Sequence, residues 1–210
     1  MNRQKKGCVR GFWCIFLFVF LLIVSGCTYM QDVGIRSYSS EFTEMLHSHT
    51  RSFKLYRDFE TVALCKATYF DRKLAMSFVD SYSKQVHLPD AEKEKLKEEW
   101  KNRTENFDEF WVALYTGDED INNLASPHPF WNVHAIYGKM IEKPLEIEEI
   151  EINRMMNQWM YLIDANRWSK NYIIRFRKMP HTGKVTLVIA SMLGTINMEF
   201  IKGGKEQWLR

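Results

Sequence analysis

The stretch Asp108–Tyr115, DEFWVALY, decides the fold, because apolar residues stand at both odd and even positions along it. Successive side chains of a strand point to opposite faces of a sheet, so the pattern predicts a strand that is buried on both faces. Such a strand favours a β-sandwich, or a sheet covered by a helix.

Most of the chain after this stretch also carries strand patterns. Glu148-Glu149 shifts the alternation of its segment by one residue, which predicts a bulge or a bend. Leu193-Gly194-Thr195 predicts a hairpin turn, and Met155–Ile163 fits either a strand or a short helix. We predict about six or seven strands, among them Asp108–Tyr115, Phe130–Tyr137 (with Trp131, Val133, Ala135 and Tyr137 on one face), Leu145–Ile152, Tyr172–Phe176, Val185–Leu193 and Ile196–Phe200.

The residues before Asp108 have a helical pattern instead. From Phe42 to Leu74 apolar residues recur at spacings of three, four and seven, and no Pro or Gly lies between Ile35 and Leu88. This predicts one long helix, or two collinear ones, over about residues 41–86. A second helix over about residues 90–104 is strongly charged and has a narrow apolar stripe of Leu96 and Trp100.

Helices followed by strands predict the α+β class: a long N-terminal helix plus a short charged helix, then a mostly antiparallel sheet or sandwich. The expected organisation is a helical region at 41–105, a β-rich region at 106–201 packed with the helices as one domain, and a tail at 202–210. The tail contains Trp208.

The first residues have the three-part layout of a secretory signal peptide. Four basic residues precede an apolar run, Phe12–Val24, of 13 residues, and two small residues follow it. The run is shorter than the roughly 20 residues that a permanent transmembrane helix needs. Residues 1–26 are therefore predicted to be removed.

The sequence Val24-Ser25-Gly26-Cys27 resembles the lipobox of bacterial lipoproteins. The resemblance implies cleavage between Gly26 and Cys27, a diacylglycerol on the Cys27 sulfur, and residues 27–40 as a lipidated Cys with its tether. Two or three acyl chains hold a protein firmly on a membrane without a transmembrane helix. Thr28 follows where Asp commonly retains such proteins at the inner membrane, so the expected location in a Gram-negative cell is the periplasmic face of the outer membrane.

Cleavage changes the charge and the cysteine count. The whole chain has 29 basic and 26 acidic residues, and the leader holds four of the basic ones, which leaves 25 against 26 and a net charge of −1. This balance argues against nucleic acid as a partner. Cys8 and Cys14 leave with the leader, so Cys65 is expected to be a single buried thiol in mid-helix.

Few residues suggest chemistry, and neither a cofactor nor a metal is predicted. His47 and His49 lie two apart on a predicted helix, about 200° of rotation, so they are not expected to hold one ion. Asp118-Glu119-Asp120 is expected to be a solvated turn, although acidic loops can bind calcium. His128, His134 and His181 are scattered, and Cys65 has no nearby His in sequence.

Binding signals are stronger than catalytic ones. Trp168, Arg175 and Arg177 form the predicted binding surface, since an exposed Trp can stack on sugars or hold a protein partner. The mature chain also resembles bacterial envelope lipoproteins that join a helical region to a β-rich half, through FDEFWVALYTGDED, FWNVHAIYG, YIIRFRK and VTLVIAS. That resemblance implies no activity.

The leading hypothesis is a membrane-anchored, non-enzymatic lipoprotein of the cell envelope, with a binding or structural role toward an envelope protein or a polysaccharide. The alternatives are an envelope hydrolase acting on wall polymers, with a site that is not visible as a motif, and an accessory subunit of an envelope complex.

Overall fold

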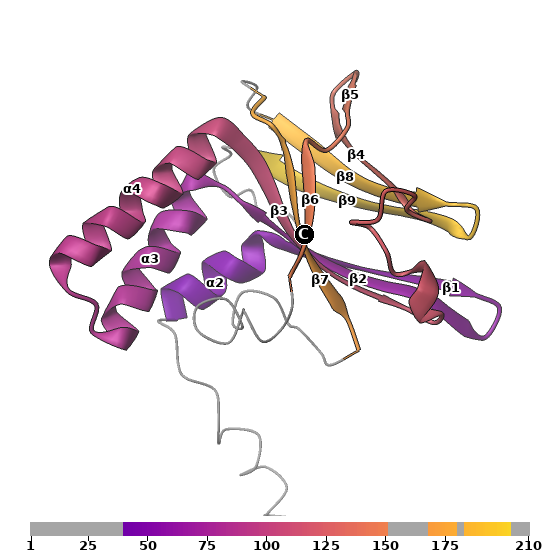
Figure 1. Ribbon diagram of the computed structural model, residues 1–210, viewed down its shortest axis with the longest axis horizontal. Helices are drawn as coiled ribbons and strands as arrows, with labels where there is room; N and C mark the ends of the chain where they lie inside the picture. The colour runs from indigo at the N-terminus through magenta and orange to yellow at the C-terminus, as the bar shows by residue number, and fades with distance from the viewer. Residues whose placement is uncertain (1–39, 151–167, 180–182, 203–210) are drawn as a thin grey trace, which may run out of the picture. The chain divides into compact units, whose positions relative to one another are not determined.

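The computed structural model describes residues 40–150, 168–179 and 183–202, which belong to one compact unit (Figure 1). The helices in these ranges are α2 (Ser40–Ser48), α3 (Arg72–Val86), α4 (Asp90–Asn106) and the short 3-10 helix η2 (Glu119–Ile121). The strands are β1 (Thr50–Arg57), β2 (Glu60–Phe70), β3 (Phe107–Thr116), β4 (Asn132–Tyr137), β5 (Met140–Glu142), β6 (Glu146–Ile150), β7 (Lys170–Arg177), β8 (Gly183–Ser191) and β9 (Gly194–Lys202).

The strands form two sheets, and every described pairing is antiparallel. Sheet A has the order β1-β2-β3-β7-β6, and sheet B has the order β5-β4-β8-β9. The expected α+β class with antiparallel sheets is confirmed. The decisive stretch lies in β3, which is the central strand of sheet A.

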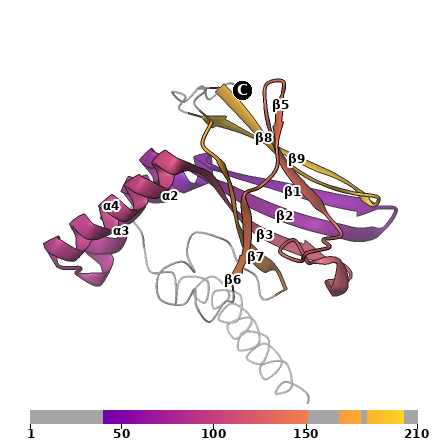
Figure 2. The same cartoon turned by 45° about the horizontal axis from the view of Figure 1, so that its top comes forward.

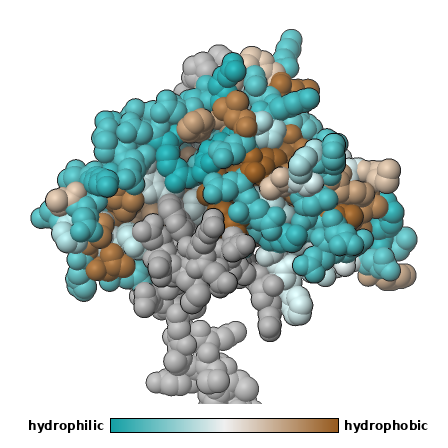
Figure 3. Space-filling view, in the orientation of Figure 1, coloured by the Kyte–Doolittle hydropathy of each residue, from teal (hydrophilic) through white to brown (hydrophobic). Residues whose placement is uncertain are grey.

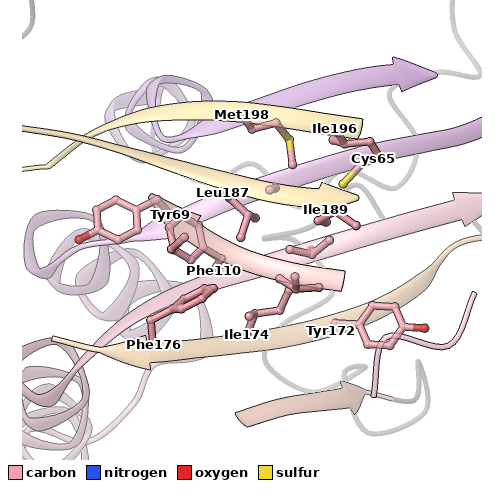
Figure 4. Packing of buried hydrophobic residues seen from close by; sticks show 14 of the residues in the cluster. Cys65, Tyr69, Phe110, Tyr172, Ile174, Phe176, Leu187, Ile189, Ile196 and Met198 are labelled. Atoms are coloured by element: carbon pink, nitrogen blue, oxygen red, sulfur yellow. The ribbon is translucent and has the colours of Figure 1, made fainter. Parts of the chain in front are cut away.

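The inner face of sheet A packs against sheet B to form the larger core (Figure 4). Phe110, Val112 and Leu114 supply this face of β3 and are fully buried. Leu187 and Ile189 of β8 contribute to the opposing face from sheet B. The core is therefore that of a β-sandwich, in agreement with the apolar pattern of the strands.

The outer face of sheet A carries the helices, over a second core. Trp111 and Ala113 of β3 pack there with Phe78 of α3 and Trp100 of α4. Figure 2 shows the helices gathered at one end of sheet A, away from the β1–β2 turn. Both faces of β3 are thus covered, one by a sheet and the other by helices.

The predicted long helix over residues 41–86 is wrong. The chain forms α2, then the hairpin of β1 and β2, and only then α3, so two strands lie inside the region 41–105 for which the sequence predicts helices. The hairpin turn contains neither Gly nor Pro, because Asp58 supplies the left-handed conformation with φ of 52°. Asp tolerates that region better than most residues, so the turn carries no obvious sequence signal.

A cap then starts α3. The Asp71 carboxylate accepts a hydrogen bond of 2.8 Å from the Leu74 N–H, which satisfies one free donor of the first turn. The predicted charged helix is confirmed as α4, with Leu96 and Trp100 facing the core.

Later strands agree with the sequence pattern except at one point. The hairpin predicted at Leu193-Gly194-Thr195 is confirmed, but its turn is Met192-Leu193, since Ser191 pairs with Gly194. Of the bulge or bend predicted at Glu148-Glu149, the bulge is wrong, because β6 pairs with β7 in unbroken register. The phase shift instead reflects an edge strand whose Ile147 and Ile150 pack into the two different cores. Met155–Ile163 and Trp208 lie outside the described residues.

Candidate functional site

Part of the outer face of sheet A lies beyond the helices. The strand register places Leu64 of β2 between Lys54 of β1 and Tyr115 of β3, so these three side chains form one cross-strand row. Directly opposed side chains in such a row are neighbours. The row is exposed or half-buried, in contrast to the helix-covered end of the same face.

A pocket lies at this row. Its described lining consists of Thr61, Leu64, Tyr115 and Trp168, and its volume is about 470 Å³. Ligand pockets in proteins have about 300–1,000 Å³. Trp168 precedes β7 and is 70% exposed, so one large indole surface faces a cavity that also offers two hydroxyl groups.

A close approach between β2 and the end of β3 shapes the pocket's edge. The Gly117 N–H donates a 3.2 Å hydrogen bond to the Val62 carbonyl. A side chain at Gly117 would place its Cβ 2.8 Å from the Thr61 carbonyl oxygen, closer than real contacts allow. Glycine is therefore required where the chain leaves β3 beside Thr61.

The predicted binding surface of Trp168, Arg175 and Arg177 is not brought together. Trp168 and Arg177 lie at opposite ends of β7, whose seven residue steps span roughly 23 Å. Trp168 lines the pocket, whereas Arg177 is exposed at the far end. Of the three predicted residues, Trp168 alone lies at the pocket.

Arg175 belongs instead to an ion-pair network centred on the buried carboxylate of Glu109. Its Nε donates to Glu109 at 3.0 Å, and its terminal nitrogens donate to Glu146 at 2.5 Å and to Glu148 at 3.2 Å. Glu109 also accepts from Arg103 at 2.7 Å and from the Trp111 indole N–H at 2.6 Å. These contacts join α4, β3, β7 and β6, so the role of Arg175 in the described structure is to stabilise the fold.

A second buried carboxylate closes one end of the sandwich. Asp108 is fully buried and accepts from the Tyr69 hydroxyl at 2.9 Å, the Lys178 ammonium at 3.1 Å and the Met179 N–H at 3.2 Å. Burial, together with the negative charge of Asp108, raises the pKa of both Tyr69 and Tyr137. Both phenols therefore stay protonated, and the cluster is a structural anchor between the two sheets.

Cys65 lies on β2 rather than in mid-helix, and the expectation that it is buried is confirmed. Burial raises the pKa of its thiol to about 12. A neutral thiol is a poor nucleophile at physiological pH. Its environment in the inner core therefore fits a packing role.

The described histidines do not converge on one point. His47 is exposed on α2, whereas His49 lies between α2 and β1 and makes a 3.3 Å contact with Asp71 through Nε2. His128 lies in a loop and His134 on β4, and His181 lies outside the described residues. Asp118 precedes η2, where its carboxylate accepts from the Asp120 N–H at 3.0 Å.

No group of three His, Cys, Asp or Glu side chains within residues 40–150, 168–179 and 183–202 has a geometry suited to a metal ion. Cys27, Gly26, the leader and the predicted tether up to residue 39 lie outside these ranges, and Ser40 is the first residue of α2. None of the described helices combines the length and apolar character that a bilayer crossing requires.

The His49–Asp71 pair predicts a pH dependence of stability. Burial opposes the charge on His49, but the hydrogen bond and charge of Asp71, with the Met45 carbonyl, raise its pKa above 6.5. For Asp71, burial is outweighed by His49 and by the Leu74 N–H, so its pKa is lowered. A group whose pKa is higher in the folded state than in the unfolded state stabilises the folded state. The full contribution is present at pH values below the unfolded pKa, and it is lost as the pH rises through the folded pKa.

The stability of the wild type should therefore decline as pH rises from about 6.5 through the raised pKa of His49. The contribution of Asp71 is lost separately, as pH falls below about 3.8 through its lowered pKa. Thermal unfolding of His49→Gln between pH 5 and 9 should lack the decline above about 6.5. The exposed His47→Gln is the matched control and should keep it. An identical pH profile for His49→Gln and wild type would rule out this linkage.

Comparison with protein-family models finds no matching family, and comparison with curated proteins finds no match either.

Three of the four lining residues are not indicated by the sequence pattern. Thr61 and Leu64 lie in the segment for which the pattern predicts a helix, and Tyr115 is predicted as a strand residue without a site. The available signal for β2 was an alternation of residues that are all buried in the structure: Ala63, Cys65, Ala67 and Tyr69. Because successive side chains of a strand point to opposite faces, this alternation also places Leu64 on the outer face.

Proposed function

We propose that this chain is a membrane-anchored cell-envelope lipoprotein with a non-enzymatic binding role, held to the bilayer by lipid on Cys27. The pocket at Trp168 is its binding site, and an envelope polysaccharide is its ligand. The observation that carries the binding role is an exposed indole at the mouth of a pocket of about 470 Å³.

The chemistry of the lining supports a sugar ligand. An indole offers a flat apolar face with a polar N–H at its edge. The C–H face of a sugar ring stacks on such a surface, while Thr61 and Tyr115 offer hydroxyl groups to the ring's own hydroxyls. The buried carboxylates Asp108 and Glu109 are engaged by structural donors, which supports binding rather than acid–base catalysis.

Trp168→Ala should weaken binding of the mature chain to purified cell-wall polysaccharide by about 10-fold or more, the effect expected of a central aromatic contact. Co-sedimentation measures the affinity. Trp168→Phe should retain part of it because a ring remains. Leu145→Ala, which truncates another exposed apolar residue, should bind like wild type. Wild-type affinity in Trp168→Ala would exclude the pocket as the binding site.

A further inference from the structure

A second apolar surface lies at the end of the sandwich opposite the helices. Phe59, in the β1–β2 turn, is fully exposed, Tyr56 beside it is 55% exposed, and Met192, in the β8–β9 turn, is 87% exposed. Figures 1 and 2 both show these two turns at the same end, and Figure 3 shows apolar atoms reaching the surface there. We define the turn-end surface as residues 56–60, 118–120 and 192.

Contacts between the two sheets hold the turns together. The Arg51 Nε donates to the Glu199 carbonyl at 3.1 Å, which joins β1 to β9. The Gly194 backbone lies against Leu55, and a Cβ at Gly194 would be 2.9 Å from the Leu55 methyl groups. Gly194 also has φ of 151°, a backbone conformation that residues with a side chain rarely adopt, so the conformation favours glycine there. Met192 is thereby held near the β1–β2 turn.

The turn-end surface is strongly acidic. The Gly117–Val62 hydrogen bond brings the 118–120 loop beside the start of β2. The surface thus holds five exposed carboxylates and one basic residue, Arg57, so its net charge is −4. The acidic residues are Asp58, Glu60, Asp118, Glu119 and Asp120. No described residue forms an ion pair with any of the five.

Large exposed apolar side chains in a cluster mark an interaction site rather than ordinary surface. An acidic rim around them selects a positively charged partner and steers its approach. It also disfavours an anionic bilayer, since like charges repel at the lipid surface. The occupant that fits is therefore a protein segment with basic and apolar side chains.

We propose that the turn-end surface docks a basic, apolar segment of a partner protein. This surface adjoins the Trp168 pocket at Thr61 and Gly117 but shares none of its described lining residues, and its function does not depend on a sugar ligand. Phe59, Tyr56 and Met192 insert between the partner's apolar side chains, and the five carboxylates pair with its lysines and arginines. The affinity should fall as salt rises, because exposed charges at the rim are screened.

The test uses the mature full chain and a fluorescent amphipathic peptide of about 14 residues, roughly four helical turns, built from lysine and leucine. Phe59→Ser with Met192→Ser should weaken binding by about 10-fold. Neutralising the loop should remove most of the salt dependence. The variants are Phe59→Ser/Met192→Ser, Asp118→Asn/Glu119→Gln/Asp120→Asn, and the matched controls Ile141→Ser and Glu92→Gln/Glu94→Gln/Glu98→Gln.

The controls alter an exposed apolar residue of β5 and exposed acids of α4, and they should bind the peptide like wild type. Equal weakening by controls and turn variants would refute the proposal, as would a wild type that does not bind up to millimolar peptide. Binding of wild type to phosphatidylglycerol vesicles that is lost in Phe59→Ser/Met192→Ser would replace the protein partner with a membrane. Circular dichroism confirms that each variant is folded.

Discussion

Replacing Asp108 with alanine is expected to lower the free energy of unfolding by about 3–5 kcal/mol, the cost of breaking a buried ion pair by removing one partner. Asp108 has no exposed surface and accepts hydrogen bonds from Tyr69 and Met179 as well as from the Lys178 ammonium. Alanine leaves a hydroxyl and an N–H buried without an acceptor, at about 1–3 kcal/mol each. Lys178 is partly exposed and can reach water, so the Tyr69 hydroxyl and the Met179 N–H account for most of the lost free energy of unfolding.

Urea unfolding at neutral pH measures this effect. Asp80→Ala is the matched control, because Asp80 also pairs with a lysine, Lys93 at 2.8 Å, but is half exposed. Surface pairs of this kind contribute about 0–1 kcal/mol. Asp108→Asn keeps an acceptor and should fall between the two. Equal losses for Asp108→Ala and Asp80→Ala would mean that the buried cluster is not an anchor between the sheets.

Removing the acyl site should have the largest effect on location. Cys27→Ala, expressed behind a leader that is cleaved without lipid addition, should move the mature chain from the membrane fraction to the soluble fraction. Each buried methylene of an acyl chain contributes about 0.8 kcal/mol, so two or three chains hold the protein firmly and their loss removes the attachment. Changing the leader together with Cys27 prevents an uncleaved leader from acting as an anchor.

Fractionation and labelling with radioactive palmitate measure the outcome. Cys65→Ala behind the native leader is the cysteine control, since that thiol is buried on β2 and should not be acylated. It should remain in the membrane fraction and keep its label. Retention of the unlipidated Cys27→Ala chain on membranes would contradict the lipid anchor.

Strand prediction succeeded where the pattern depended on burial alone. In β3, the expectation of a strand buried on both faces followed directly from DEFWVALY, and the structure covers one face with sheet B and the other with helices. Trp131, just before β4, and Val133, Ala135 and Tyr137 within it are all buried, as their shared face predicted. Such local patterns of apolar residues indicate directly whether a strand is buried on one face or on both.

Prediction failed over residues 50–70 because the sequence there satisfies two periods at once. Phe53, Ala63 and Ala67 recur at helical spacing, yet all three also point to the inner face of strands β1 and β2. β2 becomes a strand because it pairs with both β1 and β3, and its partner residues in β3 lie 39 to 53 positions later in the chain. Pairing of this kind is a tertiary effect that overrides local propensity.

The candidate sites, like the fold, depend partly on local sequence patterns and partly on tertiary structure. The sequence by itself determined the α+β class, the charged helix α4 and most strands, because each depends on a local run or period. The leader and the Cys27 anchor stay predictions from a local motif. The tertiary structure decided that Trp168 meets Leu64 and Tyr115, and that Arg175 neutralises Glu109 rather than facing a ligand. It also decided that Phe59 and Met192 lie at one end. These outcomes depend on strand register and sheet packing, which join residues that no local pattern relates.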